Sequence, residues 1–225
     1  MEATTEKPLS AVEVRVLGSL IEKEITTPDY YPLTVNALTN ACNQSSNRDP
    51  VMALDEQTVV RGLDALRERR LAFLFDGADS RVPKYGHRFG EVYPAERAEI
   101  AVLCVLMLRG PQTVGEIRGR TGRMHEFASL EEVEATLSAL ATRVPAALVV
   151  KLPRQTGFKE QRYAHLLAGD VALAAGVFAP KVEPAVMAVR QENERVAELE
   201  SEVAALRAEM AELREQFAKF SKQFE

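Results

Sequence analysis

The chain has 225 residues, of which 46% are hydrophobic and 27% are charged, as in an ordinary soluble protein. Its longest apolar run, residues 100–108, is about half of the ~18 residues that suggest a membrane span. The polar N-terminus, residues 1–8, has no apolar signal segment and is expected to be a disordered tail. These features exclude a membrane protein and favour a cytoplasmic one.

The net charge of −5 does not by itself indicate a nucleic-acid partner. The charge is unevenly distributed, because residues 9–93 carry 10 Lys and Arg against 12 Asp and Glu. Residues 94–168 carry 10 Lys and Arg against 8 Asp and Glu, so only this segment is basic.

An internal repeat with an offset of 74 to 79 residues organises the first three quarters of the chain. Thr34 and Val35 recur as Thr113 and Val114. The apolar stripe of one helix recurs too, as Val59, Leu63 and Leu66 and then as Val133, Leu137 and Leu140.

In chain order, the first copy predicts a helix after Ser10, a second after Thr34 and a third over residues 55–70, with Asp55 as its N-cap. Ser10 and Glu13 have the spacing of a capping box. Strands over residues 71–75 and 82–88 then form a hairpin across a turn rich in Gly and Asp.

The second copy predicts the same order. Helix starts are marked by Thr113 with Glu116 and by Ser129 with Glu132, both at capping-box spacing. Strands over residues 147–151 and 161–165 form the second hairpin.

Three short helices followed by a hairpin are typical of a winged helix-turn-helix unit, whose third helix is in the recognition position. The sequence therefore predicts a mainly α fold with small β-hairpins, built from two tandem winged helix-turn-helix domains and a C-terminal coiled-coil helix. The expected boundaries are a tail over 1–8, domains over 9–93 and 94–168, a linker over 169–184 and a coiled coil over 185–225.

Several runs resemble the YceH-like family of bacterial proteins: YPLT at 31–34, ACNQSSNRDPVM at 41–52, LRGPQT at 108–113 and LPR at 152–154. The resemblance covers about residues 9–168 and implies tandem winged helices without assigning a molecular role. Ser45 departs from the family pattern, in which Lys is usual, and removes a positive charge from the loop before the third helix.

The C-terminal segment has apolar residues at alternating spacings of three and four, which is the a/d seam of a coiled coil. The seam comprises Val196, Leu199, Val203, Leu206, Met210, Leu213, Phe217, Phe220 and Phe224. In a parallel dimer the flanking g and e positions pair opposite charges, as Arg195–Glu200, Glu202–Arg207 and Glu209–Arg214. The sequence thus predicts a parallel homodimer, although the three phenylalanines are bulky for a two-stranded seam.

No catalytic, cofactor-binding or metal-binding site is expected. His87, His125 and His165 lie at no metal-ligand spacing from another His or Cys, and nucleotide-binding and nucleophile motifs are absent. Cys42 and Cys104 lie in apolar helical patterns, which favours buried free thiols over a disulfide. We therefore expect a protein that is not an enzyme.

In the first copy, candidate nucleic-acid contacts are Ser46, Asn47 and Arg48 in the loop before the third helix, and Arg61 on that helix. Acids on the same helix would oppose phosphate binding. The alternative for the three loop residues is that they tie down an ordered loop through backbone hydrogen bonds.

In the second copy, glutamates crowd the start of the third helix, so the hairpin is the better candidate. Its cations are Arg154, Lys159 and Arg162, with Arg118, Arg120 and Arg123 nearby in the sequence. Such a wing can lie along a nucleic-acid backbone. The alternative is a solvated hairpin whose arginines pair with neighbouring acids.

Two functions stay open. One is a duplex-DNA-binding, transcription-regulator-like protein that is dimerised by the coiled coil. The other is a docking module that binds a protein partner and no DNA, because one fold serves both purposes.

Overall fold

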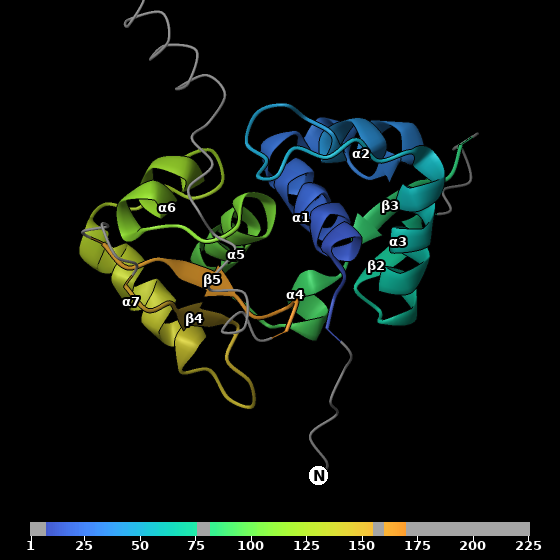
Figure 1. Ribbon diagram of the computed structural model, residues 1–225. Coiled ribbons are helices and arrows are strands. Elements are labelled where there is room, and N and C mark those ends of the chain that lie inside the picture. Colours follow the sequence, from blue (N-terminus) through green and yellow to red (C-terminus); the bar gives the residue numbers. More distant parts are fainter. Residues whose placement is uncertain (1–7, 76–81, 155–159, 170–225) are drawn as a thin grey trace, which may run out of the picture. The chain divides into compact units, whose positions relative to one another are not determined.

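A computed structural model describes residues 8–75, 82–154 and 160–169 of the chain, all of which belong to one compact unit, Met1–Leu173. Figure 1 shows α-helices with small antiparallel sheets in these residues. We call residues 8–93 the first half and residues 94–169 the second half. Several predicted features lie outside the described residues: the tail over 1–7, the turn of the first hairpin, most of the linker, the coiled coil with its seam, and Lys159.

The first half contains α1 (Ala11–Thr26), a 3-10 turn (Pro28–Tyr30), β1 (Leu33–Thr34), α2 (Val35–Cys42), α3 (Glu56–Glu68), β2 (Ala72–Phe75), β3 (Lys84–His87) and α4 (Phe89–Val92). The second half contains α5 (Arg97–Arg109), α6 (Val114–Thr121), α7 (Leu130–Ala141), β4 (Val149–Lys151) and β5 (Tyr163–His165). The order of three helices and a hairpin therefore occurs twice in the described chain, with α4 between the two sets.

The predicted helix starts are confirmed. Ser10 and Thr113 cap α1 and α6 in full capping boxes, and the Asp55 side chain accepts a hydrogen bond from Thr58 N at the start of α3. Ser129 caps α7, but Glu132 accepts from Ala128 N instead of from the backbone of the cap residue. Each cap satisfies backbone N–H groups that the helix itself leaves unpaired.

Both hairpins form, with shorter strands than expected. In the first half β3 pairs antiparallel with β2, and also with β1, which gives the strand order β1-β3-β2. In the second half β4 pairs with β5, and an isolated bridge joins Gln112 to Tyr163. The two-residue strand β1 has no periodic sequence signal, which explains why sequence reasoning missed it.

The third helix of each set buries the predicted stripe, because Leu63 and Leu137 are both 0% exposed. This result confirms the expected register of α3 and α7. The predicted free thiols are confirmed as well, since Cys42 and Cys104 are buried and unbridged.

One continuous hydrophobic cluster extends through both halves. The helices α1 and α5 pack against each other at its centre, and Gly18 permits their close approach. A Cβ atom at Gly18 would lie 3.0 Å from Leu108 Cδ2. Residues Ala101–Leu108 are buried around the whole circumference of α5, because α1 covers one side of this helix while α6 and α7 cover others. That burial accounts for the longest apolar run, and no helix in the described residues is long and apolar enough to cross a membrane.

Candidate nucleic-acid interface and an arginine-lined pocket

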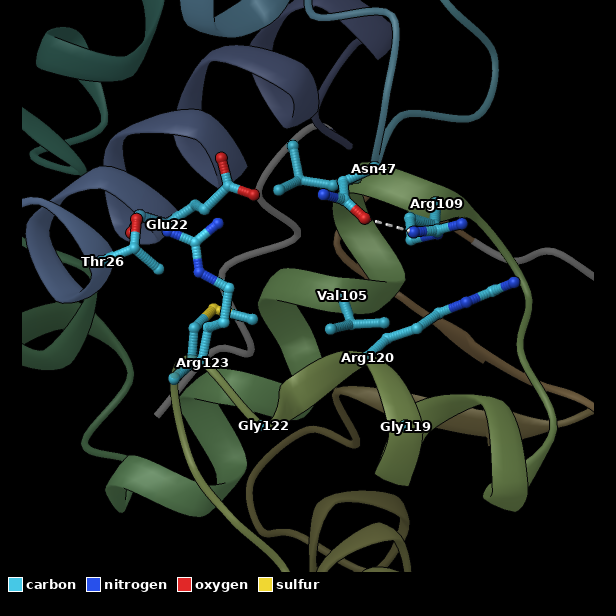
Figure 2. A pocket seen from close by; sticks show the side chains of 11 residues that line it. Glu22, Thr26, Asn47, Val105, Arg109, Gly119, Arg120, Gly122 and Arg123 are labelled. Atoms are coloured by element: carbon cyan, nitrogen blue, oxygen red, sulfur yellow. Dashed lines mark hydrogen bonds between the residues drawn. The ribbon is translucent and has the colours of Figure 1, made fainter. Parts of the chain in front are cut away.

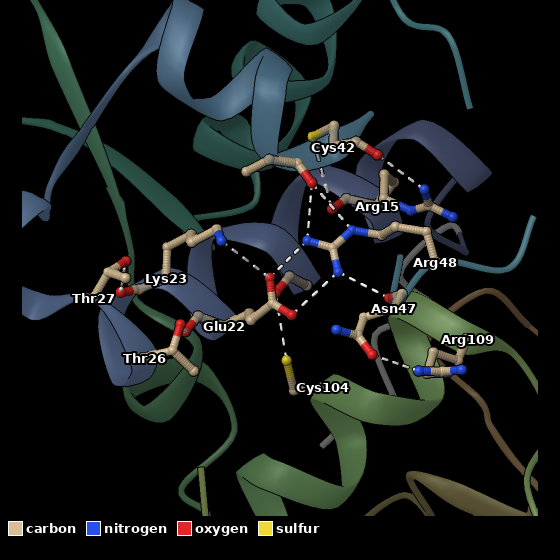
Figure 3. Close-up of polar contacts among 12 residues, drawn as sticks. Arg15, Glu22, Lys23, Thr26, Thr27, Cys42, Asn47, Arg48, Cys104 and Arg109 are labelled. Atoms are coloured by element: carbon tan, nitrogen blue, oxygen red, sulfur yellow. Dashed lines mark hydrogen bonds and ion pairs between the residues drawn. The ribbon is translucent and has the colours of Figure 1, made fainter. Parts of the chain in front are cut away.

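Arg48 points into the protein instead of toward solvent. Its side chain is 0% exposed and its Nη2 atom lies 2.6 Å from Glu22 Oε2 in α1. Its Nη1 atom donates to Glu22 Oε1 at 3.1 Å, and its Nε and Nη2 atoms donate to Ala41 O at 3.0 and 2.8 Å. Figure 3 shows this two-point contact between the guanidinium and the carboxylate. In this conformation Arg48 has no face left for a phosphate or a base.

A second arginine is buried beside the first. Arg15 donates to Cys42 O at 3.0 Å and to Pro50 O at 2.6 Å. Burial, together with the nearby positive charge of Arg48, lowers the pKa of Arg15. The two guanidinium groups therefore bind the backbone on both sides of the loop between α2 and α3 and fix this loop against α1.

The other two loop candidates are exposed. Asn47 has a φ of 57°, in the left-handed region that Asn tolerates better than most residues. Its Oδ1 atom accepts a hydrogen bond of 2.6 Å from Arg109 Nη1 of the second half. Ser46 is exposed beside it. Asn47 therefore links the loop to the end of α5.

The exposed face of α3 carries both signs of charge. Arg61 is exposed, and its Nη2 atom donates to Thr58 Oγ1 at 2.8 Å. Arg67 lies 3.1 Å from Asp64 in an exposed ion pair. This helix has little net charge to offer a phosphate backbone.

The corresponding helix α7 is acidic. Its sequence contains no Lys or Arg, and Glu131, Glu132 and Glu134 are exposed near its start. A hydrogen bond to the Ser129 side chain lowers the pKa of Glu131, so this carboxylate is charged at neutral pH. These negative charges would repel nucleic acid approaching the start of α7.

The second hairpin and α6 are joined by arginine contacts. Arg162, which is half-buried at the base of the hairpin, donates to Pro111 O at 3.2 Å and lies 3.8 Å from Glu116 Oε1. Arg120 lies 3.7 Å from the same Glu116 oxygen. Arg154 is exposed on the hairpin. Cations of α6 and of the hairpin therefore meet around one carboxylate on one side of the second half.

Arg118 has a structural role. It donates to the backbone oxygens of Phe127 and Ala128, at 3.3 and 2.8 Å, and so holds the segment between α6 and α7.

A pocket of about 270 Å³ lies where the loop and α1 of the first half face α5 and α6 of the second. Figure 2 shows its lining, in which Arg109, Arg120 and Arg123 are the cations. Sequence reasoning placed Arg120 and Arg123 near the hairpin but did not include Arg109, Glu22 or Thr26 in any site. The contribution of α1 has no sequence signal, because it depends on packing between segments about 100 residues apart.

Two of the three histidines, His87 and His165, lie in the hairpin strands β3 and β5. His87 Nε2 lies 2.9 Å from Glu24 Oε2, and His87 Nδ1 accepts a hydrogen bond from Phe89 N. The hydrogen bond to His87 lowers the pKa of Glu24. Burial lowers the pKa of His165 to about 4. The described residues contain no group of three His, Cys, Asp or Glu side chains that could hold a metal ion.

These features define a protein of α-helices and small antiparallel sheets. It has a buried arginine network in its first half, and cations of α6 and the hairpin gather around Glu116 in its second half. Residues 9–158 match a family model described as "Protein of unknown function, DUF480". A "UPF0502 protein" of Opitutus terrae is 61% identical over 176 residues, covering 78% of this chain and 76% of that protein. A "UPF0502 protein" of Geotalea uraniireducens is 55% identical over 197 residues, covering 88% and 89% of the two chains. The chain therefore belongs to this family of bacterial proteins.

Proposed function

We propose that the chain is a duplex-DNA-binding, regulator-like protein built from two winged helix-turn-helix units, as its resemblance to the YceH-like family implies. The repeated order of three helices and a hairpin supports this proposal, as do the matching caps at Thr34 and Thr113. Matching burial of Leu63 and Leu137 supports it further. On this proposal the chain binds and does not catalyse.

The proposed DNA-binding surface lies on the second half. The observation that carries it is the approach of Arg120 and Arg162 to the same Glu116 oxygen, which brings the cations of α6 and the hairpin to one side. The proposed contacts are Arg154, Lys159 and Arg162 of the hairpin, with Arg120 and Arg123 of α6 and its following turn. Arg48 is left out because its charge is buried and paired, and Ser46, Asn47 and Arg61 are secondary candidates.

Binding through this surface is electrostatic. Arginine and lysine contacts to phosphates position a protein on DNA without reading its sequence, and the mixed charge of α3 and the acidic start of α7 add little attraction. We therefore expect affinity that differs little between duplex sequences and falls steeply with salt.

A fluorescence anisotropy titration with mixed-sequence duplex DNA tests the proposal. We expect Arg154→Ala combined with Lys159→Ala to weaken binding on every duplex and to lower the slope of log K against log[salt] by about 2, because two phosphate contacts are lost. The matched control combines Arg67→Ala with Arg88→Ala, which removes two exposed cations of the first half.

The control variant should bind as the unmodified chain does. Equal weakening in both variants would show that no defined surface is used. No measurable affinity of the unmodified chain at ~50 mM salt, where electrostatic binding is favoured, would exclude DNA as the ligand.

A docking function without DNA is the second candidate, and the first hairpin favours it. The strand β2 lies at the edge of its sheet, and Leu74 and Phe75 on it are 41% and 44% exposed. Val82, which precedes β3, is 53% exposed. Exposed apolar edge strands are natural pairing sites for another chain. The acidic start of α7 also fits a protein partner better than DNA.

A further inference from the structure

The arginine-lined pocket is formed by both halves of the described chain. Glu22 and Thr26 come from α1, and Asn47 comes from the loop between α2 and α3. Val105, Leu108 and Arg109 come from α5, and Gly119, Arg120, Gly122, Arg123 and Met124 come from α6 and the turn after it. A ligand in this pocket would therefore contact both halves at once.

The charge of the pocket is positive. Arg109, Arg120 and Arg123 line it, and Glu22 is the only carboxylate among its described lining residues. The Glu22 charge is already matched by Arg48, which binds both carboxylate oxygens. Arg120 also lies 3.7 Å from Glu116 Oε1, an atom that it shares with Arg162. The arginines of the lining and beside it therefore outnumber the carboxylates near them, and a bound anion would lower the repulsion between the guanidinium groups.

The side chains are distributed along the pocket. In Figure 2, Arg109 and Arg120 project toward one end, and Arg123 points toward Glu22 and Thr26 at the other. Val105 lies between the two ends, and Leu108 adds a second apolar side chain. One end therefore offers two guanidinium groups, and the middle offers apolar surface.

We propose that this pocket binds a small phosphate-bearing ligand, with its phosphate at the end formed by Arg109 and Arg120. Guanidinium groups bind phosphate oxygens through paired N–H donors, which favours phosphate over a simple halide. The apolar middle receives the remainder of the ligand. The pocket volume of about 270 Å³ suits a small molecule and is far too small for a DNA duplex. This site shares Arg120 and Arg123 with the DNA-binding surface proposed above, and the experiment below separates the two sources of phosphate.

Two glycines of α6 make a charge-neutral test possible. A Cβ atom added at Gly115 or at Gly119 would meet nothing within 4 Å, so both positions accept a side chain. Gly119 lines the pocket and Gly115 does not. Gly119→Leu should therefore fill the pocket, and Gly115→Leu on the same helix is its matched control.

The experiment measures binding of inorganic phosphate and pyrophosphate to the full chain by calorimetry and by thermal denaturation, against sodium chloride at equal ionic strength. We expect phosphate and pyrophosphate to raise the melting temperature of the unmodified chain and of Gly115→Leu, while chloride does not. Gly119→Leu should abolish the increase. Arg120→Gln should weaken binding by about tenfold or more, as loss of a charged hydrogen bond implies.

Two results of the phosphate measurements would overturn the inference. The first is a melting temperature that responds equally to phosphate and to chloride. The second is equal loss of phosphate binding in both glycine variants. A DNA titration of Gly119→Leu separates the two sources of phosphate, because a small-ligand pocket predicts unchanged DNA affinity. If DNA affinity falls together with phosphate binding, the pocket holds a DNA phosphate and the small-ligand assignment is wrong. If the chain binds no DNA at all, the phosphate measurements still decide whether the pocket binds a small phosphate-bearing ligand.

Discussion

At the scale of single residues, the buried arginines Arg15 and Arg48 are the most unusual feature of this chain. Arginine is rarely fully buried unless it is paired, and here two guanidinium groups lie near each other with Glu22 bound to one of them. Most of their hydrogen bonds are donated to backbone oxygens at the end of α2 and in the loop that follows it. The two arginines therefore hold this loop against α1 through hydrogen bonds.

Replacing Arg48 by Met should lower the free energy of unfolding by about 3–5 kcal/mol, because Glu22 loses its two hydrogen bonds to the guanidinium group and Ala41 O loses its donors. Urea denaturation measures the change. Arg67→Met is the control, since its pair with Asp64 is exposed and should contribute about 1 kcal/mol or less. Similar losses in the two variants would show that the Arg48 pair is not a stabilising contact.

His165 should make stability depend on pH. Its pKa is lowered to about 4 in the folded chain because of burial, whereas an unfolded histidine titrates near 6.5. The folded chain therefore binds fewer protons, and stability should decrease as pH falls from about 6.5 toward 4. Melting temperatures between pH 4 and 7 should fall less steeply for His165→Phe than for the unmodified chain. Parallel curves would contradict this assignment.

At the scale of elements, each third helix is held by an apolar stripe that the sequence displays. Leu63 in α3 and Leu137 in α7 are fully buried at repeat-related positions. The caps at Asp55 and Ser129 fix where these helices begin, and the stripe then fixes which face turns inward.

Leu63→Ala and Leu137→Ala should each lower the free energy of unfolding by about 2–5 kcal/mol, through lost transfer free energy and a residual cavity. Leu74→Ala and Leu130→Ala are matched controls, since these leucines are 41% and 45% exposed. Chemical denaturation of the four variants measures the difference. If a control substitution lowers the free energy of unfolding as much as the buried one does, burial does not determine the loss of stability.

At the scale of the whole molecule, we expect the predicted coiled coil over residues 185–225 to make the protein a homodimer. Its seam and its complementary e and g charges favour a parallel pair. Sedimentation equilibrium should give a dimer for the intact chain and a monomer for a chain ending at Pro184. An intact chain that is monomeric at micromolar concentration would exclude the coiled-coil dimer.

The sequence by itself determined the local features of this fold. Caps such as Ser10 and Thr113, and stripes such as Leu63 with Leu66, depend on residues three or four positions apart, and one segment contains the whole signal. The apolar helical pattern around Cys104 also indicated a buried thiol, although it did not indicate which helices cover this residue.

Only the tertiary structure decided where Arg48 points and that a pocket exists. The sequence left Arg48 open between nucleic-acid contact and loop anchoring, because its partner Glu22 lies 26 residues away, on α1. The pocket depends on the close packing of α1 against α5 at Gly18 and Leu108, which lets Arg123 point toward Glu22 (Figure 2). These contacts join segments that are far apart in the sequence. A periodic pattern within one segment therefore cannot predict them.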